Sequence, residues 1–172
     1  MTELDEVWNR MLSDAAVNAR EQGRHDVAEY LSLKAANDAI RAAGVKWLFD
    51  SILEIAAASN RANLGISIER VEPFSFPHHG ANMVGSQLRL LLGVRCLMVE
   101  AGWSRTPSDG FMRGGSLAAA RLRHFGMPKA NAEIILIKGD SSPIWSDAAL
   151  PDVKTGLTIA DLRRHFTIFL GT

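Results

Sequence analysis

Residues 87–101, Gln-Leu-Arg-Leu-Leu-Leu-Gly-Val-Arg-Cys-Leu-Met-Val-Glu-Ala, decide the fold of this chain. Two runs rich in apolar residues, 87–92 and 94–101, are separated by a single glycine. The pattern predicts two strands with Gly93 either as a tight turn between them or as a bulge in one long bent strand.

The segments on either side extend this strand-rich region. From residue 66 to residue 76, isoleucine and phenylalanine alternate with polar side chains, and the period of two predicts an edge strand. Pro73 interrupts this strand and Pro77 closes it, because proline cannot donate to a neighbouring strand. Residues 133–138, Glu-Ile-Ile-Leu-Ile-Lys, predict a further strand.

Residues 116–125 carry two conflicting signals. Ser116 as a cap, three alanines, Gly126 and Pro128 favour a helix. Read with a period of two, the same segment forms a hairpin with 133–138. We favour the strand, because the surrounding elements are strands and 133–138 needs a partner. This interpretation gives an antiparallel meander of about five strands.

Residues 1–62 have helical periodicity instead, with apolar side chains three and four positions apart. A first helix ends near Gln22-Gly23, a second spans 26–43 and ends at Gly44, and a third spans 45–58. Thr158 caps a last helix over 159–170, and we expect a loop over 140–155.

The predicted fold class is therefore α+β: two or three antiparallel N-terminal helices packed on an antiparallel meander sheet, with a C-terminal helix. The helical layer, 1–62, and the sheet with its closing helix, 63–172, are expected to form one compact unit.

Composition narrows the function classes. The chain has 172 residues, 47% hydrophobic and 22% charged, as expected for a folded globular domain. A single cysteine permits no internal disulfide, no apolar run reaches the roughly 18 residues of a membrane helix, and acidic residues stand near the N-terminus where a signal peptide carries basic ones. We therefore expect a soluble cytoplasmic protein without a membrane interaction. A net charge of zero makes nucleic acid an unexpected partner.

The charges are unevenly distributed, and one segment is strongly basic. Residues 86–129 hold seven lysines and arginines against two acidic residues. The glycine-rich loop 102–115 can turn backbone N–H groups toward an anion, and a helix beginning at Ser116 would complete such a site. The predicted anion-binding residues are Ser104, Arg105, Arg113, Gly114, Gly115, Arg121 and Arg123.

Four residues are candidates for acid–base chemistry: His78, His79, His124 and Glu100. Adjacent histidines on a strand or loop point in opposite directions, and no further ligand stands at a recognised spacing, so we predict no metal centre and no cofactor. Glu100 is expected to pair with an arginine of a neighbouring strand.

Two functions follow from these patterns. The first is a non-enzymatic interaction or ligand-binding module with an arginine-rich, anion-binding surface. It would form homo-oligomers or dock on a protein partner through the apolar stripe of Trp8 and Met11, and it would take a small anionic ligand. The alternative is a small enzyme acting on a phosphate-bearing substrate with a histidine acid or base.

Overall fold

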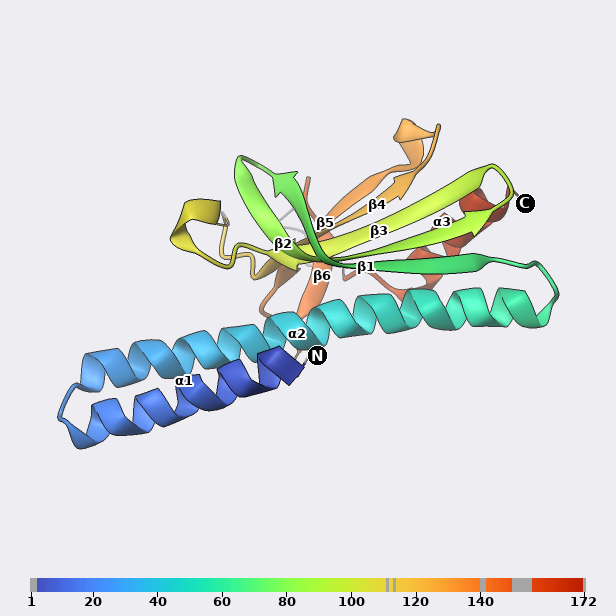
Figure 1. The fold of residues 1–172 in the computed structure, drawn as a ribbon. Coiled ribbons are helices and arrows are strands. Elements are labelled where there is room, and N and C mark those ends of the chain that lie inside the picture. Colours follow the sequence, from blue (N-terminus) through green and yellow to red (C-terminus); the bar gives the residue numbers. More distant parts are fainter. Residues whose placement is uncertain (1–2, 111, 113, 140–141, 150–155, 172) are drawn as a thin grey trace.

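The computed structural model describes residues 3–110, 112, 114–139, 142–149 and 156–171. Two helices, a six-stranded antiparallel sheet and a third helix follow one another along the chain, so the α+β prediction is confirmed (Figure 1). The elements are α1 (Glu3–Glu21), α2 (His25–Arg61), β1 (Ser67–His78), β2 (Ala81–Leu92), β3 (Arg95–Trp103), β4 (Ala118–His124), β5 (Ala132–Ile137), β6 (Ile144–Asp147) and α3 (Ile159–Leu170), with 3-10 turns at Pro107–Asp109 and Pro128–Ala130.

The sheet is a simple meander in the order β1-β2-β3-β4-β5-β6. Leu92 pairs with Arg95, so Gly93 belongs to a tight turn rather than to a bulge. The strand interpretation of 116–125 is confirmed by β4, which pairs with β5 as predicted. The short sixth strand, β6, lies within the segment predicted to be a loop.

The N-terminal helices form an antiparallel hairpin, with α1 on the side of α2 that faces away from the sheet (Figure 1). The predicted end of a helix at Gly44 is wrong, because α2 continues through it. Gly44 instead permits close packing. A Cβ atom there would lie 2.6 Å from Leu136 Cδ2 of β5, and its carbonyl accepts a 2.9 Å hydrogen bond from Trp145 Nε1 of β6.

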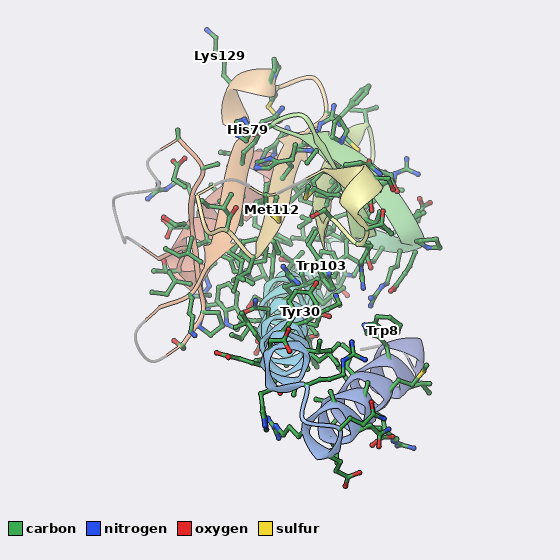
Figure 2. The ribbon with its side chains drawn as sticks, turned by 90° about the vertical axis from the view of Figure 1, so that its left-hand side faces the viewer. Trp8, Tyr30, His79, Trp103, Met112 and Lys129 are labelled. Atoms are coloured by element: carbon green, nitrogen blue, oxygen red, sulfur yellow. The ribbon has the colours of Figure 1, made fainter. Side chains whose placement is uncertain are left out.

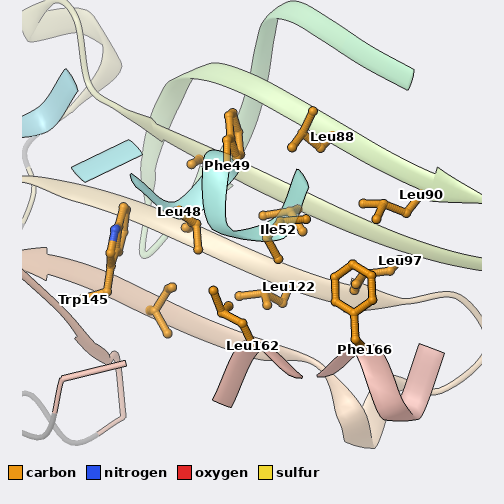
Figure 3. Packing of buried hydrophobic residues seen from close by; sticks show 14 of the residues in the cluster. Leu48, Phe49, Ile52, Leu88, Leu90, Leu97, Leu122, Trp145, Leu162 and Phe166 are labelled. Carbon is orange, nitrogen blue, oxygen red and sulfur yellow. The ribbon is translucent and has the colours of Figure 1, made fainter. Parts of the chain in front are cut away.

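The main hydrophobic core lies between one face of the sheet and the helices α2 and α3 (Figure 3). Alternate residues of the central strands, such as Leu97 and Val99, point into it and are fully buried. From α2 come Leu48, Phe49 and Ile52, and α3 contributes Leu162, Phe166 and Phe169. The C-terminal helix begins as predicted, because Thr158 and Asp161 form a reciprocal capping box.

The far end of the β1–β2 hairpin folds over the other face of the sheet. Gly85 allows this bend, since a Cβ atom there would lie 2.0 Å from the carbonyl oxygen of Ala101. Phe76 and Met83 from the hairpin bury themselves on Ala119 of β4 and form a second, smaller core. The bend places the hairpin turn, residues 78–81, above β4 and β5.

No helix in the described part of the chain combines the length and hydrophobicity that crossing a membrane requires.

Candidate functional site

A row of polar residues crosses the sheet face beneath the folded hairpin. Register places Gln87, Glu100, Arg121 and Glu133 side by side on β2, β3, β4 and β5. Glu100 is 1% exposed and accepts hydrogen bonds from Gln87 Nε2 at 3.0 Å and from Arg121 Nε at 2.8 Å. The expected pairing of Glu100 with an arginine of a neighbouring strand is therefore observed.

Arg121 is occupied by contacts within the protein. Besides Glu100, its guanidinium donates to the carbonyl oxygen of Pro77 at 3.1 Å and lies over the Phe76 ring at 4.7 Å. It thereby ties the hairpin to β4. Arg123 is more exposed, and its Nη1 atom lies 3.8 Å from Oε1 of Glu100, the carboxylate oxygen that Gln87 also contacts. These two predicted anion ligands thus surround a buried carboxylate that already balances part of their charge.

The hairpin turn brings His78 and His79 together instead of separating them. The expectation that they point in opposite directions is wrong, because His79 adopts the left-handed conformation at φ 45°. The ring centroids are 4.3 Å apart. Glu133 of β5 completes the group, with its Oε2 atom 3.8 Å from Nδ1 of His78.

His78 is buried, and its environment disfavours the charged ring. Burial and the neighbouring His79 lower the pKa of His78, and these effects outweigh the opposite influence of Glu133. The imidazole is therefore neutral near pH 7. Its Nδ1 atom is buried and has no hydrogen-bond partner among the residues that the structure describes.

His124 lies elsewhere, at the end of β4, and contacts a histidine that the sequence analysis missed. Its Nε2 atom is 3.0 Å from Nδ1 of His165 on α3, and the two rings stack. Burial lowers the pKa of both rings. The neighbouring His165 lowers the pKa of His124 further, and Arg164 lowers that of His165 against the opposite influence of Asp161. In the sequence, His165 stands three positions after the apolar Leu162, and this spacing places both residues on the same side of a helix. The spacing could have predicted that His165 faces the sheet.

A cleft of about 620 Å³ lies between the first residues of β5, the end of β6 and the first two turns of α3. Two of the histidines and Glu133 of the polar row line it. Its ionisable lining residues are His79, Glu133, Asp147, Asp161, Arg164 and His165. Three carboxylates thus stand against one arginine, so acidic side chains are in excess over Arg164 in this cleft.

The segment 104–110 lies against α2 on one side, and its far end contacts the hairpin, where Asp109 Oδ1 accepts a 3.4 Å hydrogen bond from Asn82 Nδ2 and Gly110 lies beside Ala81. It forms a groove of about 250 Å³ with the first half of α2. Figure 2 shows Tyr30 and Trp103 on this side and His79 distant from α2. The polar lining residues are Tyr30, Lys34, Asn37, Arg41, Ser104, Arg105 and Thr106.

Asp109 fixes the conformation of this segment. Its Oδ2 atom accepts hydrogen bonds from the backbone N–H groups of Arg105 and Thr106, at 3.1 and 2.9 Å, and from the Thr106 hydroxyl. These bonds lower the pKa of Asp109. The Arg105 guanidinium stacks on Trp103, 3.8 Å from the ring centroid.

The remaining predicted anion ligands do not join this groove. Gly114 and Gly115 form an exposed turn before β4, and Arg113 lies outside the described residues. Because the chain enters a strand after Ser116, the helix N-terminus that would have completed the loop site does not exist. The six predicted anion-binding residues that the structure describes are thus divided among the α2 groove, this turn and the face of the sheet beneath the hairpin.

Comparison with known proteins gives no relatives: no family model, no curated protein and no solved structure matches this chain.

Proposed function

We propose that this protein is a non-enzymatic ligand-binding module that takes a small anion in the groove between α2 and residues 104–110. One observation carries the proposal: Lys34, Arg41 and Arg105 line the groove, and no acidic residue is among its described lining residues. Asp38 is not among the lining residues and bonds both Lys34 and Arg41, so these two cations exceed its single negative charge. The Ser104 hydroxyl supplies a further donor, whereas the Thr106 hydroxyl already donates to Asp109.

The chemistry of these groups favours phosphate or carboxylate. A guanidinium stacked on an indole ring keeps its N–H donors in its own plane, where they meet a planar or tetrahedral anion edge-on. Tyr30 at the groove also offers an aromatic ring beside the cations. A phosphate attached to a flat organic group therefore fits the groove better than a bare inorganic ion.

Calorimetric titration with pyrophosphate and a panel of nucleotides at low salt tests the proposal. Replacing both Lys34 and Arg105 by alanine should weaken binding at least tenfold, because a hydrogen bond to a charged group contributes about 1.5–3 kcal/mol. Arg89→Ala is the matched control, since Arg89 pairs with Glu69 on the exposed sheet edge. Wild-type protein that binds none of these anions, or a double variant that binds as wild type does, would refute the anion site.

We further propose that the chain self-associates through α1. Three large apolar side chains on one side of α1 are exposed: Val7, Trp8 at 47% and Met11 at 58%. An unpartnered apolar stripe of this kind is typical of helix–helix association. The cytoplasmic location expected from the lone cysteine stays a prediction.

A second candidate function, a small enzyme acting on a phosphate-bearing substrate, is favoured by the histidines around the cleft at the start of α3 and by Arg164, the cation of its described lining, whereas the three carboxylates oppose phosphate binding. His79 and His165 line the cleft, and His78 and His124 contact them. Hydrolysis of aryl phosphate mono- and diesters by the wild-type chain, lost in His79→Ala, would support this function over the binding module.

A further inference from the structure

Three metal-ligating side chains meet at the turn of the folded hairpin. Ligand atoms of His78, His79 and Glu133 all lie within 4.8 Å of one another. Their residues come from two places distant in sequence, and the hairpin that bends over the sheet brings them together. We propose that these three residues bind one divalent transition-metal ion, with Zn²⁺ as the best match.

The distances suit a shared ion. Bonds of about 2.0–2.2 Å place two ligand atoms on a tetrahedral zinc ion about 3.4 Å apart. His78 Nδ1 and Glu133 Oε2 are already 3.8 Å apart. The Glu133 side chain is half-exposed, so it has room for the small rotation that closes the site.

The unpartnered nitrogen of His78 is a separate observation that points to the same ligand. The side chain is only 6% exposed, and its Nδ1 atom has no hydrogen-bond partner in the described part of the chain. A buried polar atom without a partner is costly, and this atom faces a carboxylate. A cation between the two atoms satisfies both, and the neutral ring that burial favours is the form that ligates metals.

The donor types select the class of ion. Imidazole nitrogen suits zinc and the other late first-row metals, whereas Ca²⁺ and Mg²⁺ prefer oxygen ligands alone. Two histidines and one glutamate form a three-ligand set, which leaves a coordination position open. His79 and Glu133 also line the cleft, so the exposed side of the ion faces it and balances part of its excess of carboxylates.

The test uses the full-length protein after treatment with a chelating resin. Titration with Co²⁺, followed by its visible absorption, and calorimetric titration with Zn²⁺ should both report one site per chain. Glu133→Gln and His79→Ala should each weaken Zn²⁺ binding at least tenfold and abolish the Co²⁺ absorption. His25→Ala, which removes a histidine at the distant start of α2, is the matched control and should bind as wild type does.

Glu133 and His79 have exposed side chains, so their variants are expected to fold, and circular dichroism and the melting temperature check this. The proposal is overturned if wild-type protein gives no Co²⁺ absorption, or if the Glu133 and His79 variants keep wild-type affinity. A loss of equal size in His25→Ala would also overturn it, because it would indicate nonspecific surface binding. The anion groove shares none of its lining residues with the proposed metal site, so the two tests use different variants.

Discussion

At the residue scale, the buried carboxylate of Glu100 makes the strongest prediction. Arg121 is its principal charged partner and also fastens the hairpin through Pro77. Arg121→Ala should lower the free energy of unfolding by about 3–5 kcal/mol, because removing one partner leaves a buried charge uncompensated. Urea denaturation followed by circular dichroism measures the change.

The neighbouring Arg123 supplies the control for this prediction. It lies 3.8 Å from the same carboxylate but is 47% exposed, so Arg123→Ala should cost less than about 1 kcal/mol. Equal losses in the two variants would contradict the division of roles between a structural and a surface arginine.

Part of the candidate site could be predicted from single residues of the sequence, and part could not. Glu100 is a lone carboxylate within an apolar strand, and this was enough to predict an arginine partner, because every position of a central strand lies next to a residue of the adjacent strand. Whether His78 and His79 meet depended on the backbone conformation of one residue, His79, which no periodicity reports. The approach of Glu133 depended in turn on the hairpin that bends over the sheet and brings distant segments together.

At the scale of elements, Gly44 tests why α2 continues through a residue that usually ends helices. In a helix interior alanine is more favourable than glycine by about 1 kcal/mol, but here its Cβ atom collides with Leu136. Overpacking costs about 1–3 kcal/mol, so after the gain in helix propensity Gly44→Ala should destabilise the protein by up to about 2 kcal/mol.

Shortening Leu136 should reverse the sign of this effect. In a Leu136→Ala background the collision is removed, and Gly44→Ala should then stabilise the protein through helix propensity alone. A double-mutant cycle of urea unfolding measures the difference. If Gly44→Ala has the same effect in both backgrounds, contact with β5 is not the reason for the glycine.

Element boundaries explain where the sequence-based fold was right and wrong. The strands β3 and β5 and the helix α3 carry their own local signals, which are apolar runs, turns and a capping box. The local signals of β4 conflicted, and it was predicted as a strand because β5 needed a partner. The reason for Gly44 lies 92 positions away in Leu136. The strand β6 has only four residues, and its edge position is defined by pairing with β5 rather than by a pattern of its own.

The contact between β4 and α3 predicts a dependence of stability on pH. Burial holds the pKa values of His124 and His165 below the ordinary value of 6.5. As the pH falls below about 6.5, the unfolded chain therefore binds protons before the folded chain does, and the free energy of unfolding decreases. The decrease levels off once the pH is below the folded-state pKa values.

Urea midpoints at about pH 7.5 and about pH 5.5 measure this loss. The double variant His124→Gln, His165→Gln should lose less stability over this interval than wild type. A smaller loss remains because His78 has a lowered pKa as well. An identical decrease in wild type and the double variant would show that the histidine pair is not responsible.

At the scale of the whole molecule, the two proposed binding sites have different lining residues, although the segment 104–110 of the groove contacts the hairpin that carries His78 and His79. The core between the sheet and α2 holds both in place: α2 forms one wall of the anion groove and also anchors the strands that carry Glu133 and the hairpin. A ligand in the groove and an ion at the hairpin turn therefore share one rigid frame but touch no common residue.

The helix α1 packs on α2 and not on the sheet, so deleting it tests self-association without removing the main core. Deleting residues 1–21 should leave the core of the sheet intact, because α1 packs on the side of α2 that faces away from the sheet (Figure 1). Deleting residues 1–62 should instead abolish folding. It removes Leu48, Phe49 and Ile52 from the core, each contributing about 1.5–3 kcal/mol when fully buried.

The shorter deletion also tests self-association. Light scattering after size-exclusion chromatography should give multiples of 18.8 kDa for the full chain and a single subunit for the chain without α1. Trp8→Glu with Met11→Glu should have the same effect, whereas Ser13→Glu, an exposed polar position on the same helix, should not. If the full chain is a monomer, or if charges at Trp8 and Met11 leave an oligomer intact, the apolar stripe of α1 is not the contact between subunits.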